Sequence, residues 1–275
     1  MHLVNMIFNT ITMAMHQTIL DNLDRIEQQH NVTILWACES GSRAWGFPSP
    51  DSDYDVRFIY AHQPSAYIRV FDKRDVIEEP IDGLLDINGW DIKKALGLLR
   101  KSNPALMEWL SSPIIYKQHA AIQPLTELAK DAFLPISSCH HYLSMARQDI
   151  NKLVIGSDIR LKKYLYMFRA LLAAQWVIEH GTQPPMRFQE LVQRFLPSGD
   201  IKEQIDELLH LKTNVLESEM IPAQEDLDQY LLALYGRLEK QIPAPLSAPN
   251  TESFDACLLK TLLTLHPHGR FTNAN

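Results

Sequence analysis

Two short motifs in this sequence carry residue types suited to chemistry on phosphate groups. Gly41 and Ser42 follow a short, strand-like apolar run at residues 33–38, and a helix is expected to start at this turn. Such a turn exposes backbone N–H groups that bind phosphate oxygens, and glycine allows close backbone approach. Asp53 and Asp55 follow after ten intervening residues, on one face of the next predicted strand. Two carboxylates on one strand face are natural oxygen ligands for Mg²⁺.

A third carboxylate, Asp86, lies on the second arm of a predicted hairpin. The arms at residues 75–81 and 84–90 flank Asp82-Gly83, a dipeptide typical of tight hairpin turns. Three acids on neighbouring strands can hold two metal ions about 4 Å apart. One ion then activates an attacking hydroxyl, and the other stabilises a leaving pyrophosphate. The pattern therefore predicts a site for two Mg²⁺ ions made by Asp53, Asp55 and Asp86.

Each of these signals has an ordinary explanation when it is taken alone. A Gly-Ser pair is usually a turn, a D-x-D pair is often a solvated strand face, and an acid near a hairpin can belong to the turn. The combination is more specific, and Arg43 beside the turn adds a guanidinium that suits a triphosphate. Asp91 is an alternative third acid, but helix capping explains its position.

The pattern of apolar residues predicts the elements that must position these side chains. The N-terminal part alternates strands with helices, whereas helical patterns alone follow Pro113. We therefore expect a catalytic domain at residues 1–118, a helical domain at 119–242, and a flexible linker and tail at 243–275. Helices are expected at about 12–30, 91–101, 120–132, 138–155, 158–180, 187–196, 200–216, 224–240 and 252–266, and strands at 33–38, 53–60, 75–81 and 84–90.

The spacing Gly41-Ser42-x10-Asp53-x-Asp55 resembles the signature of the DNA polymerase beta-like nucleotidyltransferase superfamily. The longer strings ESGSRAWGF, SDYDVRFIY, DINGWDIKKAL and NPALMEWLSSPIIY resemble the RlaP family of predicted nucleotidyltransferases, which is associated with RNA ligases. The resemblance covers roughly residues 33–196. It implies an α+β fold in which a small mixed sheet with flanking helices precedes an all-α domain. It also implies NTP and Mg²⁺ as ligands.

The resemblance implies a reaction in which an acceptor hydroxyl attacks the α-phosphate of an NTP and pyrophosphate leaves. Gly41, Ser42, Asp53, Asp55 and Asp86 stand at the motif positions. An RNA 3′ end is the favoured acceptor because of the family's association with RNA ligases. A protein side chain or a small molecule, including in a toxin–antitoxin role, is an alternative. A module that senses nucleotides without turnover is a hypothesis of a different class.

The helical part contains one basic segment, residues 143–169, with six basic residues against two acidic ones and a net charge of +4. Lys162, Tyr166 and Arg169 follow a spacing that places them on one helix face. We hypothesise that Lys162 and Arg169 bind the triphosphate or guide a nucleic-acid 3′ end, with Tyr166 available to stack on a base. A solvated helix with acidic partners is the alternative.

Composition limits the class of protein. The net charge of −7 argues against a basic coat for nucleic acid, although two bound Mg²⁺ ions would offset part of it. With 46% hydrophobic residues the chain can bury a sizeable core. Three cysteines without a metal or disulfide spacing suit a reducing compartment. No stretch approaches the roughly 20 apolar residues of a membrane helix. We expect a soluble, cytoplasmic protein, whose oligomeric state the sequence leaves open.

Overall fold

The computed structural model describes residues 2–71, 73–153, 157–247 and 249–267. Its centre is a mixed five-stranded sheet with the strand order β3-β4-β2-β1-β5. The β2–β4 pair is parallel, and the other neighbouring strands are antiparallel. The strands are β1 (Val32–Glu39), β2 (Tyr54–His62), β3 (Val76–Glu78), β4 (Leu85–Asp91) and β5 (Ile115–Gln118).

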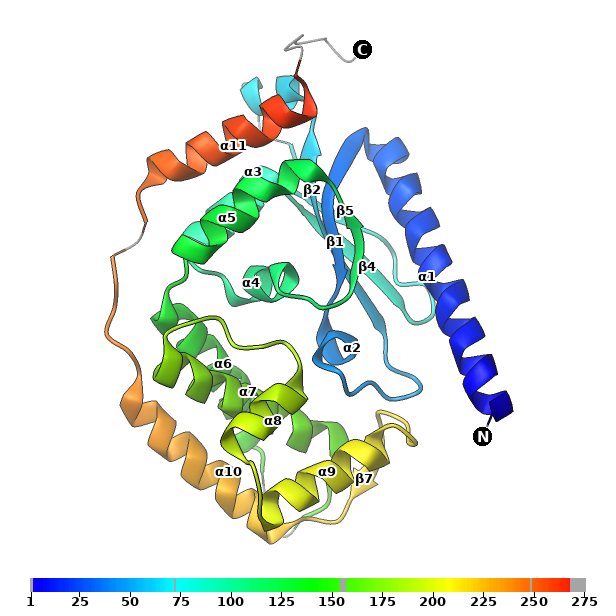
Figure 1. The fold of residues 1–275 in the computed structure, drawn as a ribbon, viewed down its shortest axis with the longest axis vertical. Coiled ribbons are helices and arrows are strands. Elements are labelled where there is room, and N and C mark those ends of the chain that lie inside the picture. Colours follow the sequence, from blue (N-terminus) through cyan, green and yellow to red (C-terminus); the bar gives the residue numbers. More distant parts are fainter. Residues whose placement is uncertain (1, 72, 154–156, 248, 268–275) are drawn as a thin grey trace.

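Helices cover both faces of this sheet (Figure 1). The long helix α1 (His2–His30) packs Ile19, Leu23 and Ile26 against one face. On the other face α3 (Ile92–Arg100), α4 (Pro104–Leu110) and α5 (Gln123–Asp131) share a second core with β1 and β2. Because both faces are covered, β1 is buried along almost its whole length, which explains its continuous apolar run.

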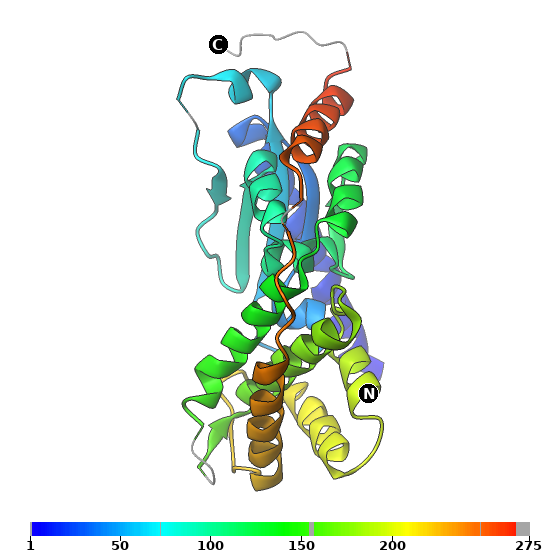
Figure 2. The ribbon, with the colours of Figure 1, turned by 90° about the vertical axis from the view of Figure 1, so that its left-hand side faces the viewer.

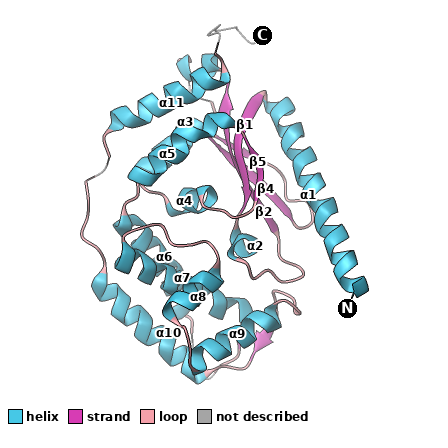
Figure 3. Cartoon of the chain, viewed as in Figure 1, coloured by secondary structure: helices cyan, strands magenta, loops and turns pink. Residues whose placement is uncertain are grey.

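The second half of the chain is helical apart from the short pair β6 (Ile159–Arg160) and β7 (Met220–Ile221) (Figure 3). Its centre is α7, which has twelve buried residues and contacts each of the four other helices. The helices are α6 (Pro135–Ile150), α7 (Leu161–His180), α8 (Phe188–Phe195), α9 (Asp200–Lys212) and α10 (Glu225–Leu238). This architecture confirms the expected fold class, a small mixed sheet with flanking helices followed by a helical part.

The packing groups the helices and strands differently from the expected domains at residues 1–118, 119–242 and 243–275. After α10 the chain leads back to the sheet (Figures 1 and 2), where α11 (Thr251–Leu265) packs on α5 and α3. Helix α5 also belongs to the core on the sheet side. We propose that the sheet-containing unit extends to about residue 132 and includes α11. Three short 3₁₀ helices complete the fold: η1 (Pro64–Ile68), η2 (Ala120–Ile122) and η3 (Glu239–Gln241).

The two halves meet at the Gly-Ser turn. The short helix α2 (Gly41–Trp45) follows β1, and its residues Ala44 and Trp45 are part of the core of the helical half. Tyr166 of α7 packs edge-on against Trp45, with ring centroids 5.2 Å apart. Within the described residues, no helix combines the length and the apolar character that crossing a bilayer requires.

Candidate active site

Gly41 begins α2 in a conformation that only glycine adopts without strain. Its φ is +61°, and a Cβ added at this position would lie 2.2 Å from Oδ2 of Asp55. The turn therefore brings the backbone directly against the Asp55 carboxylate, which lies at the start of β2. Ser42 follows as a buried residue within α2. The structure thus brings the backbone of Gly41 against Asp55, with Ser42 as the next residue of the turn.

Asp53 and Asp55 have different surroundings. Asp53 precedes β2 and is exposed, and no group in the described parts of the chain hydrogen-bonds or ion-pairs with its carboxylate. Asp55 is partly buried, and burial raises the pKa of its carboxyl group. The nearby Arg57 guanidinium opposes that rise, while Asp86 adds to it. Asp53 is consequently available to an external cation, whereas Asp55 already has protein partners.

Asp86 lies opposite Asp55 in the register of the parallel strands β2 and β4. Nη2 of Arg57 bridges the two acids, 2.8 Å from Oδ1 of Asp55 and 2.7 Å from Oδ2 of Asp86. Arg57 alternates with Asp53 and Asp55 along the sequence, but it was not among the candidate site residues. The spacing of two residues between Asp53, Asp55 and Arg57 was the signal that could have indicated this role, because a cation on the same strand face neutralises neighbouring acids.

Glu39 is a second residue that the sequence analysis did not single out. It ends β1, is 1% exposed, and accepts the backbone N–H of Asp55 at 2.7 Å on its Oε1 atom. The Tyr116 hydroxyl donates to its other oxygen. Burial raises the pKa of Glu39 to about 7. A carboxyl at the end of an otherwise apolar strand was the only hint of this contact, which fixes the backbone at Asp55.

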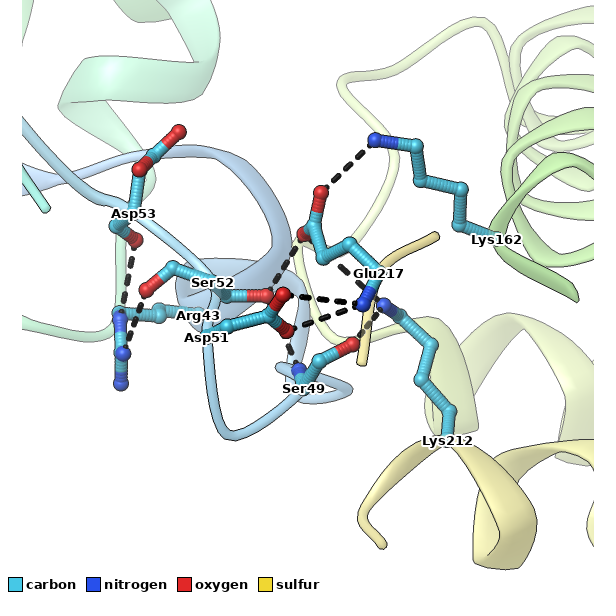
Figure 4. Close-up of polar contacts among 8 residues, drawn as sticks. All are labelled: Arg43, Ser49, Asp51, Ser52, Asp53, Lys162, Lys212 and Glu217. Carbon is cyan, nitrogen blue, oxygen red and sulfur yellow. Dashed lines mark hydrogen bonds and ion pairs between the residues drawn. The ribbon is translucent and has the colours of Figure 1, made fainter. Parts of the chain in front are cut away.

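Arg43 holds the loop that leads to Asp53. Its Nε donates to the carbonyl of Asp53 at 3.0 Å, and its Nη2 donates to that of Ser52 at 2.7 Å (Figure 4). The guanidinium also stacks on the Tyr54 ring, 3.6 Å from the centroid. Two donor groups of Arg43 therefore hold this loop by hydrogen bonds. The sequence analysis expected this guanidinium to bind a triphosphate.

The helical half contributes Lys162 and Tyr166 to the edge of the site. Lys162 is partly buried, and its Nζ lies 2.7 Å from Oε2 of Glu217. Burial raises the pKa of Tyr166, and the charges of Glu217, Asp55 and Asp53 are close enough to contribute. The basic segment therefore reaches the Asp53 loop indirectly, because Glu217, the partner of Lys162, accepts a hydrogen bond from Ser52.

Arg169 lies elsewhere. It is 1% exposed, donates to Glu108 at 2.9 Å, and lies over the Trp45 ring at 4.0 Å. This burial argues against direct contact with a nucleotide, and we assign Arg169 to the joint between the two halves. Lys163 of the same segment pairs with Asp149. Half of the six cations thus have acidic partners: Lys162, Lys163 and Arg169.

The donor set fits Mg²⁺ by its chemistry, since Asp53, Asp55 and Asp86 lie at or just before the starts of β2 and β4. In the described part of the chain, however, no three acidic, histidine or cysteine side chains already stand at metal-binding geometry. The Arg57 guanidinium lies between Asp55 and Asp86 and supplies the positive charge there.

Comparisons with known proteins identify the family of this chain. A family model described as RlaP: RNA repair pathway DNA polymerase beta family matches residues 15–260. The Bacillus subtilis (strain 168) protein named Uncharacterized protein YcgL is 45% identical over 218 residues, which are 79% of this chain and 84% of that protein. A nucleotidyltransferase-like protein from Exiguobacterium sibiricum 255-15 aligns over 93% of this chain and 81% of its own, with 13% identity and a TM-score of 0.29. The chain belongs to the RlaP family, the RNA repair pathway DNA polymerase beta family.

Proposed function

We propose that this protein is a Mg²⁺-dependent nucleotidyltransferase that transfers an NMP from an NTP to an acceptor hydroxyl and releases pyrophosphate. Membership of the family and the fold support a polymerase beta-like nucleotidyltransferase in general terms. The observation that carries the finer proposal is the juxtaposition of Gly41, Asp55 and Asp86, with Asp53 two residues before Asp55 and without a side-chain partner among the described residues. Three free, buried cysteines are consistent with a reducing, cytoplasmic environment.

Asp53, Asp55 and Asp86 would hold two Mg²⁺ ions. When bound, such ions lower the pKa of an attacking hydroxyl and neutralise the charge of the leaving group. Asp86 would also accept the proton of the acceptor hydroxyl. Glu39 keeps the backbone of Asp55 in place through its hydrogen bond to the Asp55 N–H.

The remaining residues would bind the nucleotide. Gly41 and Ser42 would hold phosphate oxygens through the backbone N–H groups of the turn. Arg43 follows this turn in the chain, and Lys162 of the helical half, which pairs with Glu217, would supply a second cation. Arg43 would act mainly by shaping the loop, since its guanidinium already binds two carbonyl groups of that loop.

We favour an RNA 3′ end as the acceptor. Support comes from the family description, which places the family in RNA repair. The partly exposed Lys162 and Tyr166 beside the acids add a cation and an aromatic ring, which are the groups that bind a single-stranded end.

Labelled NTPs test the reaction and its acceptor together. The purified protein is incubated with each α-labelled NTP and Mg²⁺, in the presence of tRNA, total RNA or a protein lysate. The proposal predicts label on RNA and release of pyrophosphate. Label on a protein or on a small molecule would show that the acceptor is that molecule and not RNA. Nucleotide binding without pyrophosphate release would instead identify a nucleotide sensor.

A further inference from the structure

Glu217 reaches from the helical half to the loop that carries Asp53. It lies between α9 and β7, and its Oε1 accepts the hydroxyl of Ser52 at 2.8 Å (Figure 4). Its backbone N–H donates to the Asp51 carboxylate at 2.9 Å. Arg43 binds the same loop from the other side through the carbonyls of Ser52 and Asp53. The position of Asp53 therefore depends on both halves of the molecule.

Two lysines face the Glu217 carboxylate. Lys162 donates to its Oε2 at 2.7 Å, and Nζ of Lys212 lies 4.0 Å from its Oε1. Lys212 is 1% exposed and also donates to Ser49 at 2.6 Å. Burial would raise the pKa of Glu217, but the hydrogen bonds from Lys162 and Ser52 outweigh it and lower that pKa. Glu217 is thus a partly buried anion held by one partly buried and one fully buried cation.

The two lysines differ in what they can reach. Lys212 is buried, so its ammonium group can contact only neighbouring protein groups, namely Ser49 and Glu217. Lys162 remains 28% exposed, and Tyr166, one turn further along α7, packs against Trp45 of α2, the helix that Gly41 begins. Lys162 is therefore the cation that an entering phosphate chain can approach. Its present partner is the Glu217 carboxylate.

We propose that Glu217 is a positioning residue for the Asp53 loop and competes with the nucleotide's triphosphate for Lys162. This inference rests on the proposed function. Without nucleotide, Glu217 neutralises Lys162. With nucleotide, the more highly charged triphosphate takes over Lys162, while Lys212 and Ser52 keep Glu217 and the loop in place. The release of Lys162 then leaves no unpaired carboxylate, because Lys212 stays beside Glu217.

The variant Glu217→Gln separates the two roles. The amide keeps the shape and an oxygen acceptor for Ser52, but it removes the negative charge that holds Lys162. We expect tighter binding of the phosphate chain, by up to about fivefold, since partly exposed ion pairs contribute about 1 kcal/mol or less. An ordinary structural role would instead weaken binding or leave it unchanged. In a Lys162→Met background the same substitution should have no effect, because the contested cation is absent.

Calorimetric titration of the full chain with inorganic tripolyphosphate, and separately with ATP and Mg²⁺, tests this without any turnover. The matched control is Glu219→Gln, which removes an exposed acid from the segment between α9 and β7 that also carries Glu217. This substitution should leave the affinity unchanged. Tighter binding in Glu217→Gln alone, abolished by Lys162→Met, supports the proposal. Unchanged or weaker binding in Glu217→Gln, or no binding of tripolyphosphate to any of the proteins, would overturn it. An equal gain in affinity in Glu219→Gln would overturn it too, as would a gain that persists in the Lys162→Met background.

Transfer assays distinguish this inference from the proposed function. If the titrations show the expected pattern but no NMP is transferred to any acceptor, the proposed reaction fails and the competition for Lys162 stands. If the protein transfers NMP and the titrations lack the pattern, the role given to Glu217 fails alone.

Discussion

Asp55 lies directly opposite Asp86 on the neighbouring parallel strand, and both are the second residues of their strands. Parallel pairing is what makes this possible, because the N-terminal ends of β2 and β4 then fall at the same edge of the sheet. The antiparallel strand β1 ends at that edge too, which brings Glu39 and Gly41 to the same place. Acids that are far apart in the sequence thus become neighbours through strand register.

Asp53→Ala and Asp55→Ala should both abolish NMP transfer but differ in stability. Loss of a metal-binding acid removes several kcal/mol of transition-state stabilisation, which corresponds to about a thousandfold or more in rate. Asp53 has no protein partner in the described structure, so its removal should change the free energy of unfolding by less than about 0.5 kcal/mol. Removal of Asp55 leaves Arg57 with one partner fewer and should destabilise the fold more. Transfer assays and urea unfolding measure the two effects, and transfer retained by the double variant would contradict the assignment.

Arg57→Met should make stability depend more strongly on Mg²⁺. Without the guanidinium, Asp55 and Asp86 face each other with no counter-charge, and their repulsion destabilises the fold in the absence of metal. Mg²⁺ would then supply the missing charge and need not displace Arg57. We expect a larger rise in melting temperature on adding Mg²⁺ than in the unmodified protein, measured against EDTA. Arg57→Lys keeps the charge and is the control, and an equal rise in all three proteins would argue against a metal site here.

Gly41→Ala should remove activity through a steric effect on Asp55. The added Cβ would lie 2.2 Å from Oδ2 of Asp55, so the carboxylate must move. Gly83→Ala is a matched control, since Gly83 has a similar φ of +59° but nothing within 4 Å of an added Cβ. Both variants carry the backbone strain of about 1 to 3 kcal/mol, but only Gly41→Ala should lose transfer. Melting temperatures and transfer rates measured side by side test this, and equal activities would show that the contact has no functional consequence.

The sequence predicted many local elements because their signals are local, but α4 was missed, and β5, β6 and β7 lie where helical patterns alone were expected. The alternation at residues 53–60 and the Asp82-Gly83 turn were sufficient to place Asp55 and Asp86 on strands. Arg57, Glu39 and Glu217 were missed as functional partners because their contacts depend on strand register and on the packing of the two halves. No spacing rule within one segment contains that information.

For Arg169, local spacing suggested a role in nucleotide binding that the packing does not support. Helical spacing placed it on the same face as Lys162, which suggested a basic surface. Whether a cation on a helix is solvated or buried depends on its partners, and here Glu108 and Trp45 come from the other half of the molecule. The position of these partners becomes visible only in the fold.

Arg169→Met should therefore affect stability and leave nucleotide affinity unchanged. Loss of one partner of a buried ion pair leaves Glu108 uncompensated, which costs about 3 to 5 kcal/mol of unfolding free energy. Most of this loss should be recovered in the double variant Glu108→Gln/Arg169→Met, because no buried charge then remains unpaired. Urea unfolding measures the stability of all three proteins, and titration with ATP and Mg²⁺ measures affinity in the double variant, which keeps the fold. Normal affinity there assigns Arg169 to the joint between the halves, whereas a tenfold loss at recovered stability would return it to the nucleotide site.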